Sequence, residues 1–189
     1  MELEQTTLSG GEIDALARRI DRPIVLVGMM GVGKTSVGRK LAGLLHLPFT
    51  DADDEIETAA QMSIPEMFER FGEAYFRDGE RRVIARLIDG DRKVIATGGG
   101  AFVNPETRAL ILDKAICVWL DSEIETLLDR VTRKDSRPLL RQGDPRDVLT
   151  RLRSERAKFY AEAPIHVLSG SGPQTRTLAK VLKGIAEWL

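Results

Sequence analysis

An eight-residue segment, G-M-M-G-V-G-K-T at residues 28–35, restricts the folds open to this chain more than any other feature. It follows a short apolar run from Pro23 to Gly28, and from Gly33 onward the apolar residues recur at helical spacing. A continuous apolar run between a proline and a glycine is typical of a strand buried on both faces. The segment thus matches G-x-x-x-x-G-K-[ST] between a strand and a helix, the context that a phosphate-binding loop requires.

The residue types of this segment suit ATP. Glycines let the backbone wrap around phosphate oxygens, and a helix N-terminus adds N–H groups and a positive dipole end. Lys34 would place its cation on the β- and γ-phosphates, and the Thr35 hydroxyl would ligate Mg²⁺. The alternative is a glycine-rich turn in which the Lys-Thr pair is accidental. The ATP-binding residues expected here are Gly31, Val32, Gly33, Lys34, Thr35 and Ser36.

Four further short apolar runs follow, and helical patterns separate them. Strands that alternate with helices predict a parallel sheet with helices on both faces, whose ligands bind outside the carboxyl ends of the strands. The further strands are expected within residues 47–50, 93–98, 115–121 and 165–169. The segments expected at the carboxyl ends are 28–35, 51–53, 98–100, 121–122 and 169–173.

Capping patterns predict where several helices begin. Ser63-Ile-Pro-Glu66 and Ser122-Glu-Ile-Glu125 are capping boxes, and Asn104-Pro105 offers a cap followed by proline at the first helical position. Gly72 is expected to separate two helices. Residues 134–146 lack a steady apolar period and are expected to form an exposed loop.

Residues 1–22 are expected to form an extension before the first strand, and residues 23–189 a single domain. A chain of 189 residues suits one α/β domain with a substantial core. The Gly10-Gly11 pair is expected to break the extension. An apolar stripe then follows at helical spacing, and a docked helix and a partly mobile tail are both open; its residues are Ile13, Leu16, Ala17 and Ile20.

The composition points away from several kinds of partner. The formal net charge of −1 gives no sign of nucleic acid or an anionic membrane as a partner, and no apolar run approaches the roughly 18–20 residues that span a bilayer. The single cysteine, Cys117, is expected to be a buried thiol, since nothing nearby supplies a set of zinc ligands. A cytoplasmic protein is expected, with a monomer as the default.

An acidic cluster, T-D-A-D-D-E-I-E at residues 50–57, follows the second expected strand. Such a cluster is often a solvated helix start, where negative side chains favour the helix dipole, and this interpretation suits its last three acids. Asp51 and Asp53 are two residues apart, so in an extended chain their side chains point to the same face. These two carboxylates are therefore candidates for chemistry.

Two nucleotide-binding classes fit poorly. A regulatory GTPase needs an N-K-x-D segment to read guanine, and the only asparagine, Asn104, lies in N-P-E-T. A motor or remodelling ATPase is usually larger and carries an apolar strand that ends in Asp, whereas the third strand here ends in T-G-G-G. The acid on the metal side must come from elsewhere, and the second strand ends in Asp51. The pattern favours a small-molecule kinase.

Six motifs, in their order, resemble those of the shikimate kinases, which belong to the nucleoside-monophosphate-kinase-like P-loop group. They are GMMGVGKTSVGRKLA at 28–42, DAD at 51–53, FRDGE at 76–80, TGGGAF at 97–102, RP at 137–138 and ERAKFY at 155–160. The resemblance runs from about Pro23 to the C-terminal helix. It implies an α/β P-loop kinase fold with a five-stranded parallel sheet of order 2-3-1-4-5, and a mobile lid at about residues 131–146.

The resemblance also implies an activity and its participants. Family members use MgATP to phosphorylate the 3-hydroxyl of shikimate, which gives shikimate 3-phosphate and ADP in chorismate and aromatic amino acid biosynthesis. Asp53 corresponds to the carboxylate that binds the substrate hydroxyls and is a candidate general base. Arg77 and Arg156 correspond to the arginines that grip the shikimate carboxylate. A glycine turn corresponds to a substrate-contacting turn, with Gly99 as the expected backbone donor; it comprises Gly98, Gly99 and Gly100.

The remaining roles concern ATP and its metal. Arg137 corresponds to the lid arginine that reaches the transferring phosphate, and it joins Lys34 and Asp53 as a catalytic residue. Arg130 resembles the arginine that stacks on adenine, with Arg133 as a competitor.

Asp51 would hold Mg²⁺ through water, together with Thr35. Gln174 lies in the expected adenine loop, whose sequence VLSGSGPQT departs from the family's V-[DN]-T because Leu168 replaces the polar residue.

Each assignment has a rival. Arg77 could simply pair with Glu80 on a helix surface, or Glu80 could orient Arg77 for the substrate. Arg156 could lie on a solvated helix face; otherwise Arg151 and Arg153 are the surface members of that run. The alternative functions are a gluconate-type kinase on the same fold and a nucleotide-binding module without catalysis.

Overall fold

Five parallel strands form the centre of the molecule. The computed structural model describes residues 8–133 and 143–189. The spatial order of the strands is β2-β3-β1-β4-β5, and every pairing between neighbours is parallel. Their bounds are β1 Ile24–Val27, β2 Phe49–Asp51, β3 Val94–Ala96, β4 Ile116–Asp121 and β5 Ile165–Leu168. The predicted parallel sheet and its strand order are confirmed.

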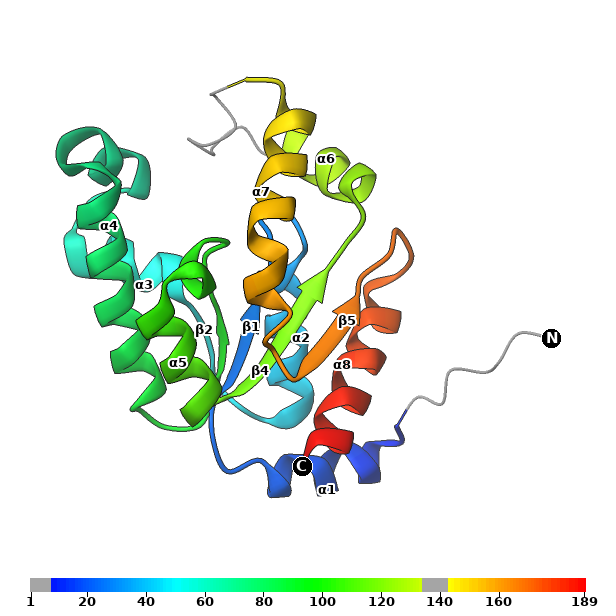
Figure 1. Cartoon of the computed structure of the whole chain (residues 1–189). Helices are drawn as coiled ribbons and strands as arrows, with labels where there is room; N and C mark the ends of the chain where they lie inside the picture. Colours follow the sequence, from blue (N-terminus) through cyan, green and yellow to red (C-terminus); the bar gives the residue numbers. More distant parts are fainter. Residues whose placement is uncertain (1–7, 134–142) are drawn as a thin grey trace.

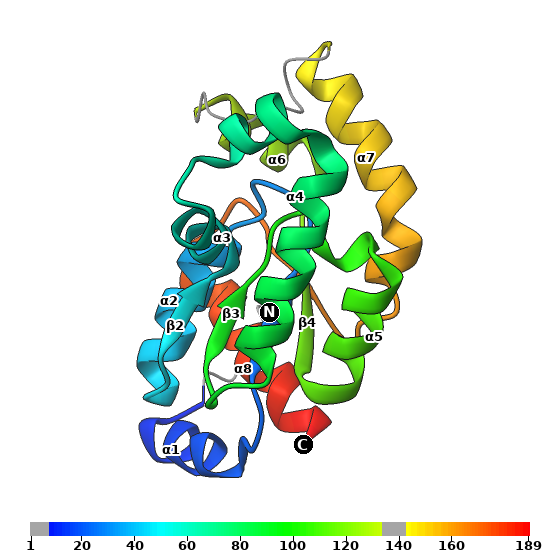
Figure 2. The same cartoon turned by 90° about the vertical axis from the view of Figure 1, so that its left-hand side faces the viewer.

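Helices cover both faces of this sheet (Figures 1 and 2). On one face lie α2 (Lys34–Leu45) and α8 (Gln174–Trp188), and α1 (Gly10–Arg19) packs against α2 at the amino ends of the strands (Figure 1). On the other lie α4 (Ile64–Ile88), α5 (Pro105–Lys114) and α7 (Pro145–Tyr160). Three short helices follow the carboxyl ends of β2, β3 and β4, and these are α3 (Ala52–Ala60), η1 (Ala101–Val103) and α6 (Ile124–Thr132).

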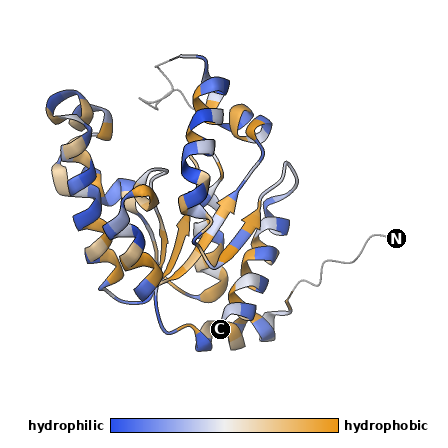
Figure 3. Cartoon of the chain, in the orientation of Figure 1, coloured by the Kyte–Doolittle hydropathy of each residue, from blue (hydrophilic) through white to orange (hydrophobic). Residues whose placement is uncertain are grey.

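Apolar residues gather on the strands and polar residues on the outer sides of the helices (Figure 3). Every residue of β1 and β3 is buried, as their continuous apolar runs predicted. Cys117 in β4 is also fully buried, and burial raises the pKa of its thiol to about 12. Among the described residues, no helix combines the length and the apolar character needed to cross a bilayer.

The helix before the first strand is docked on the amino ends of the strands. The expected break at Gly10-Gly11 is wrong, because these glycines are the first residues of α1, behind a capping box of Ser9 and Glu12. Ile20, which ends the helix, is fully buried, and its carbonyl accepts a hydrogen bond from Arg92 at 2.6 Å. Residues 1–7 of the expected extension lie outside the described residues.

The long helix α4 consists of two segments. Gly72 has φ 81° and ψ 174°, which interrupts the helix and is a conformation that side chains rarely adopt. The predicted separation at Gly72 is confirmed. The bend lets both segments contribute side chains to one cavity, with Phe68 before it and Phe76 after it.

One of the predicted helix caps is confirmed and another is wrong. Asn104 caps α5 as predicted, since its side chain accepts the N–H groups of Glu106 and Thr107. The capping box at Ser122 is wrong, because α6 begins one residue later, behind Glu123, without a side-chain cap. The Ser122 hydroxyl instead donates to the Ser169 carbonyl at 2.8 Å. This bond ties the loop after β5 to the end of β4.

Candidate active site

A cavity of about 960 Å³ lies at the carboxyl ends of the strands. Its walls come from the loop after β1, the start of α3, both segments of α4, the Gly98–Gly100 turn, α6, α7 and the loop after β5. This is the edge predicted for ligands of a parallel sheet, and the volume is at the upper end of the range for small-molecule sites. The cavity is large enough for a nucleotide and a second small molecule.

The loop after β1 has the backbone of a phosphate cradle. Gly28, Gly31 and Gly33 have φ angles of 140°, 79° and 99°. A Cβ at Gly28 would lie 2.2 Å from the Leu120 carbonyl oxygen, so only glycine fits there. The Lys34 ammonium donates to two carbonyl oxygens of the loop, at 2.7 and 2.9 Å. All the expected ATP-binding residues of this loop line the cavity, namely Gly31, Val32, Gly33, Lys34, Thr35 and Ser36.

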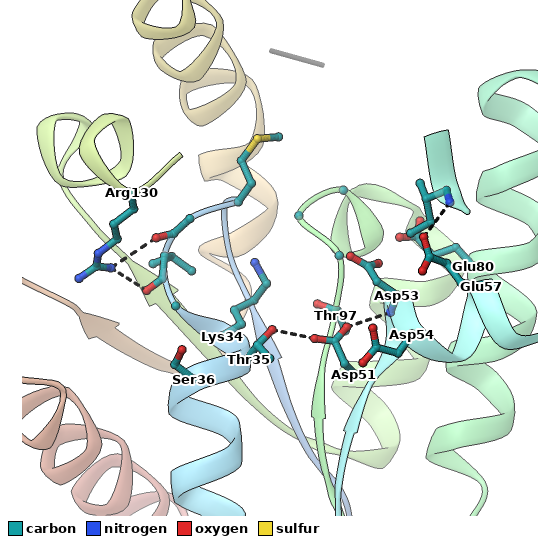
Figure 4. Close-up of a pocket in the computed structure, with 18 of the residues that line it drawn as sticks. Lys34, Thr35, Ser36, Asp51, Asp53, Asp54, Glu57, Glu80, Thr97 and Arg130 are labelled. Carbon is teal, nitrogen blue, oxygen red and sulfur yellow. Dashed lines mark hydrogen bonds between the residues drawn. The ribbon is translucent and has the colours of Figure 1, made fainter. Parts of the chain in front are cut away.

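Two carboxylates stand beside this loop (Figure 4). Thr35 Oγ1 donates to Asp51 Oδ2 at 2.7 Å, and the Asp53 N–H donates to Asp51 Oδ1 at 3.0 Å. The extended geometry expected for this pair is wrong, because α3 begins at Ala52, so Asp51 is its N-cap and Asp53 lies in its first turn. Both carboxylates nevertheless line the cavity.

Two of the three later acids of the cluster lie in the first turn of a helix, as predicted, and Glu57 lies one turn further on and lines the cavity. Asp54 and Glu55 lie in the first turn of α3, and Glu55 pairs with Arg86 at 2.8 Å. Glu57 accepts the N–H of Ile64 at 2.9 Å and so joins α3 to α4. Asp54 also lines the cavity, where burial and then the Asp51 charge raise the pKa of its carboxyl group.

Arg130 connects the phosphate loop to the loop after β5. Its guanidinium donates to the carbonyl oxygens of Val32 at 3.0 Å and Gly170 at 3.2 Å (Figure 4 shows it over the phosphate loop). Arg133 also lines the cavity, but its side chain is 75% exposed and pairs with Asp129. Of the two arginines that compete for the adenine role, the geometry therefore favours Arg130.

The loop after β5 reaches the cavity through only part of its length. Ser169, directly after β5, and Gln174, the first residue of α8, line it, whereas Leu168, the last residue of β5 and the one that departs from the family pattern, is 47% exposed and does not. Asp121 and Ser122, which were also expected at this edge, stay behind the loop: the Asp121 carbonyl accepts the Ser169 N–H at 2.8 Å.

Arg77 pairs with Glu80 inside the cavity. Arg77 Nη1 lies 2.8 Å from Glu80 Oε2, and a longer contact of 3.4 Å joins its other nitrogen to Glu73. The alternative, in which Arg77 and Glu80 pair on the helix surface, is wrong, because the Glu80 side chain is 3% exposed and both residues line the cavity. Burial raises the pKa of Glu80, and the Arg77 charge offsets part of that rise.

The three glycines of the turn each lie against a different charged side chain. A Cβ at Gly98 would lie 2.9 Å from Glu80 Oε1 and 3.0 Å from Asp53 Oδ1. A Cβ at Gly100 would lie 2.6 Å from Arg77 Nη2. The absence of side chains on this turn therefore leaves room for the two carboxylates and the guanidinium.

Arg156 approaches the same turn from α7. It is 8% exposed, so the rival reading as a solvated helix face is wrong, and its Nη1 lies 3.5 Å from the Cβ position of Gly99. Arg151 is a surface residue as expected, at 60% exposure. Arg153 is not, because it is half-buried and pairs with Asp121 at 3.2 Å.

Two buried atoms at this turn lack hydrogen-bond partners. In the described part of the chain, the buried side-chain nitrogens and oxygens without a partner are Arg156 Nη1 and Glu80 Oε1. Buried polar groups are nearly always paired, so such a pair of atoms at a cavity wall marks a place where a polar ligand fits.

Several residues at the site carried no prediction. Phe68 and Phe76 form an apolar wall of the cavity, and the Tyr160 hydroxyl donates to the Gly99 carbonyl. Phe76 and Tyr160 stand inside the motifs FRDGE and ERAKFY. Their residue type was no guide, because aromatic side chains are common in protein cores as well as in binding sites.

Arg137 and most of the expected lid, at residues 134–142, lie outside the described residues. Of the expected lid, only its two ends are described, where α6 ends at Thr132 and α7 begins at Pro145.

Thr35 and Asp51 fit a magnesium ion. Their hydrogen-bonded oxygens lie side by side at the cavity wall, next to the phosphate loop. Mg²⁺ takes oxygen ligands and usually binds through one or two protein groups together with phosphates. In the described residues, no group of three or more carboxylate, histidine or cysteine ligands gathers at one point. The donor set therefore suits a metal that arrives with a nucleotide.

Known proteins resemble this chain over nearly all of its length. A family model described as shikimate kinase matches residues 30–186. The shikimate kinase of Novosphingobium aromaticivorans is 63% identical over 193 aligned positions, which cover 100% of both chains. The structure of shikimate kinase from Acinetobacter baumannii in complex with shikimate is 36% identical, with a TM-score of 0.84 over 95% of this chain and 98% of that one.

A more distant structure shares the fold alone. A gluconokinase from Sinorhizobium meliloti is 17% identical, with a TM-score of 0.61 over 90% of this chain and 95% of that one. The family model spans most of the chain, and the curated relative is far more similar to it than this distant structure is. This chain belongs to the shikimate kinase family.

Proposed function

We propose that this chain transfers the γ-phosphoryl group of ATP to the 3-hydroxyl of shikimate, giving shikimate 3-phosphate and ADP. This is an enzyme of chorismate and aromatic amino acid biosynthesis. Membership of the shikimate kinase family supports the proposal, and so does the cavity, which joins a phosphate cradle to a pocket with arginines and a carboxylate.

The observation that carries the substrate assignment is the unpaired guanidinium atom of Arg156. A buried guanidinium nitrogen without a hydrogen-bond partner costs free energy, and a carboxylate in the cavity would supply that partner. Arg77 lies one residue further along the same turn, against Gly100, and offers a second fork. Asp53 supplies an acceptor for hydroxyl groups. A hydroxylated carboxylic acid satisfies all three groups together.

The chain's own residues account for most of the proposed transfer. Asp53 binds the attacking hydroxyl and takes its proton, as a positioned carboxylate can. Lys34 and the N–H groups at the start of α2 neutralise charge on the phosphates. Arg130 closes the nucleotide side by linking the two loops that flank it. Arg137, which lies outside the described residues, is proposed to add a cation to the transferring phosphate.

Magnesium is proposed as the metal that accompanies ATP. Thr35 and Asp51 would hold it, Asp51 through water. When bound, it would neutralise charge on the β- and γ-phosphate oxygens.

One assay tests the function. ADP release is measured with ATP and either shikimate, gluconate or no acceptor. Turnover that depends on shikimate is expected. Turnover without an acceptor, or with gluconate alone, would refute the proposal. Neither alternative has a specific observation in its favour, because the gluconokinase likeness extends to the fold only.

We further propose a monomeric cytoplasmic enzyme with one kinase domain at residues 23–189, preceded by an extension at 1–22, and a lid at about 131–146. A lid that closes over ATP would exclude water from the reaction. Hydrogen exchange of peptides from 131–146 is expected to slow when ATP and shikimate are added together. Exchange that stays the same there would argue against the lid.

A further inference from the structure

Tyr160, at the end of α7, touches the substrate turn from the side of the core. It is 1% exposed, and its hydroxyl donates to the carbonyl oxygen of Gly99, a residue 61 positions earlier. Gly99 lines the cavity, whereas Tyr160 is not among the lining residues. The hydroxyl therefore acts on the turn from behind, without access to a ligand.

An aromatic stack holds the ring of Tyr160 in place. The ring lies between Phe102, at 6.4 Å between centroids, and Trp119, at 5.8 Å. Trp119 stacks in turn on His166 at 3.9 Å. Burial raises the pKa of the Tyr160 hydroxyl to about 12, with the Arg156 charge acting against that rise. The hydroxyl consequently stays protonated near neutral pH and remains a hydrogen-bond donor.

The hydrogen bond orients one particular peptide group. The carbonyl of Gly99 and the N–H of Gly100 belong to the same trans peptide, so they point in opposite directions. Tyr160 draws the carbonyl toward the core, which turns the Gly100 N–H away from the core. Gly100 lines the cavity directly beside the Arg77 guanidinium.

The same residue also fixes the helix that carries Arg156. Tyr160 and Arg156 are four residues apart on α7, so they share one helix face. Anchoring Tyr160 to Gly99 therefore sets the position of Arg156 along the turn, where its unpaired Nη1 lies 3.5 Å from the Cβ position of Gly99.

We propose that Tyr160 is a positioning residue for the carboxylate-binding part of the site: its hydroxyl fixes the Gly99–Gly100 peptide and the register of Arg156 against it. The inference rests on the proposed function, because the carboxylate in question is that of shikimate. If Tyr160 were only structural, its hydroxyl would matter for stability and leave substrate binding unchanged.

The first test is Tyr160→Phe, which keeps the ring in its stack and removes one hydrogen-bond donor. The KM for shikimate is expected to rise about 3- to 10-fold, the usual worth of one hydrogen bond, while the KM for ATP stays unchanged and kcat falls less than the KM rises. Tyr75→Phe removes the hydroxyl of the other tyrosine, which is 52% exposed, and serves as the matched control.

A loss of stability alone is excluded by a second control. Ile111→Val trims a fully buried side chain of α5 that does not line the cavity, and it is expected to lower the melting temperature without changing the KM for shikimate. If Ile111→Val raised that KM as much as Tyr160→Phe does, the positioning role would be wrong.

A double-mutant cycle tests the route through Arg156. In the Arg156→Lys background the effect of Tyr160→Phe on shikimate binding is expected to shrink, because the fork that Tyr160 positions is gone. Additive effects of the two changes would refute the link between Tyr160 and Arg156.

A spectroscopic measurement does not depend on the stability of Tyr160→Phe. The chain has two tyrosines, so the Tyr75→Phe variant grown with 3-fluorotyrosine carries a single ¹⁹F label, at Tyr160. Shikimate is expected to shift this resonance, and a shikimate analogue without the carboxylate is expected not to. If the ¹⁹F resonance does not shift when shikimate is added, the proposal is wrong.

The outcomes separate the two claims. If the wild-type enzyme shows no turnover that depends on shikimate, the proposed function fails. If the wild-type enzyme is active and Tyr160→Phe keeps the wild-type KM for shikimate, the function stands and the positioning role fails.

Discussion

At the scale of single residues, the site depends on glycines, which have no side chain, as much as on charged residues. The Gly98–Gly100 turn lies in contact with four charged side chains, those of Glu80, Asp53, Arg77 and Arg156. These neighbours leave no room for a side chain at Gly98 or Gly100. The turn does not need glycine for its backbone angles, because its φ values are not in the left-handed region. It needs glycine for space.

Gly98→Ala tests this requirement for space. The added Cβ would meet Glu80 Oε1 and Asp53 Oδ1 at 2.9 and 3.0 Å, so it must displace the partner of Arg77 and the carboxylate proposed to bind the substrate hydroxyls. The kcat/KM for shikimate is expected to fall about 10²-fold, the usual cost of a misplacement near 1 Å, while the dissociation constant for ATP stays unchanged.

The control is Gly79→Ala in α4, where a Cβ meets nothing within 4 Å. It is expected to keep full activity and to gain about 0.5–1 kcal/mol of stability, since alanine favours a helix more than glycine does. Equal losses in both variants would contradict the explanation.

Asp53→Asn tests the carboxylate that faces the acceptor. The amide keeps the shape of the side chain but is a poor proton acceptor, so kcat is expected to fall about 10²- to 10⁴-fold. Calorimetry should show unchanged ATP binding, because the phosphate loop is intact. Near-normal turnover would show that Asp53 neither takes the proton nor anchors the hydroxyl.

At the scale of the element, different helices line different parts of the cavity. α3 and α4 line the cavity beside the Gly98–Gly100 turn, and α2 and α6 line it beside the phosphate loop. α1 contributes to neither: it packs against α2 at the opposite end of the strands from the cavity (Figure 1). Its burial of Leu16 and Ile20 makes it a part of the core rather than a tail.

Leu16→Ala in α1 is expected to lower stability and spare catalysis. Leu16 is 3% exposed, and truncating a buried leucine costs about 2–5 kcal/mol of unfolding free energy. Denaturant unfolding should show this loss, while kcat and both KM values at 25 °C match the wild type. Arg18→Ala, an exposed change on the same helix, is the control and should alter neither.

At the scale of the whole molecule, the sheet concentrates charge in one place. The cavity collects carboxylates and guanidinium groups from α3, α4 and α7 at the carboxyl ends of the strands. Burial of ionisable groups such as Glu80 and Arg156 costs stability where their hydrogen bonds are incomplete. The pH dependence of folding reports that cost.

The raised pKa of Glu80 determines whether its contribution to stability rises or falls with pH. Burial raises the pKa of Glu80 in the folded chain above 4.5, its value in the unfolded chain. Between these two pKa values the native state binds more protons than the unfolded state, so the Glu80 contribution to stability falls as pH rises. The unfolding free energy of the wild type minus that of Glu80→Gln should therefore decrease as pH rises from 4.5 and then level off. A difference that grows over this range would mean that the Arg77 charge outweighs burial.

The sequence by itself determined the features that neighbouring residues build together. Four features depend on residues that are close together in the sequence, and all four were correctly predicted. They are the phosphate loop, the central strands, the bend at Gly72 and the cap at Asn104. The resemblance added the strand order. The pairing of Asp51 with Asp53 was predicted for the wrong reason, since a capping bond, and not an extended chain, places both at the cavity.

Only the tertiary structure decided the partners of groups far apart in sequence. Ser122 fits a capping box locally, yet its hydroxyl is held by Ser169, 47 residues later, because β4 and β5 are neighbours in the sheet. Arg151 and Arg153 are two residues apart in one charge-rich run, but Arg153 pairs with Asp121 and Arg151 with Glu155. Tyr160 also meets Gly99 through tertiary packing, because α7 packs against η1, which follows the glycine turn. Sequence spacing sets which side chains share a helix face, whereas the packing of strands and helices sets what that face meets.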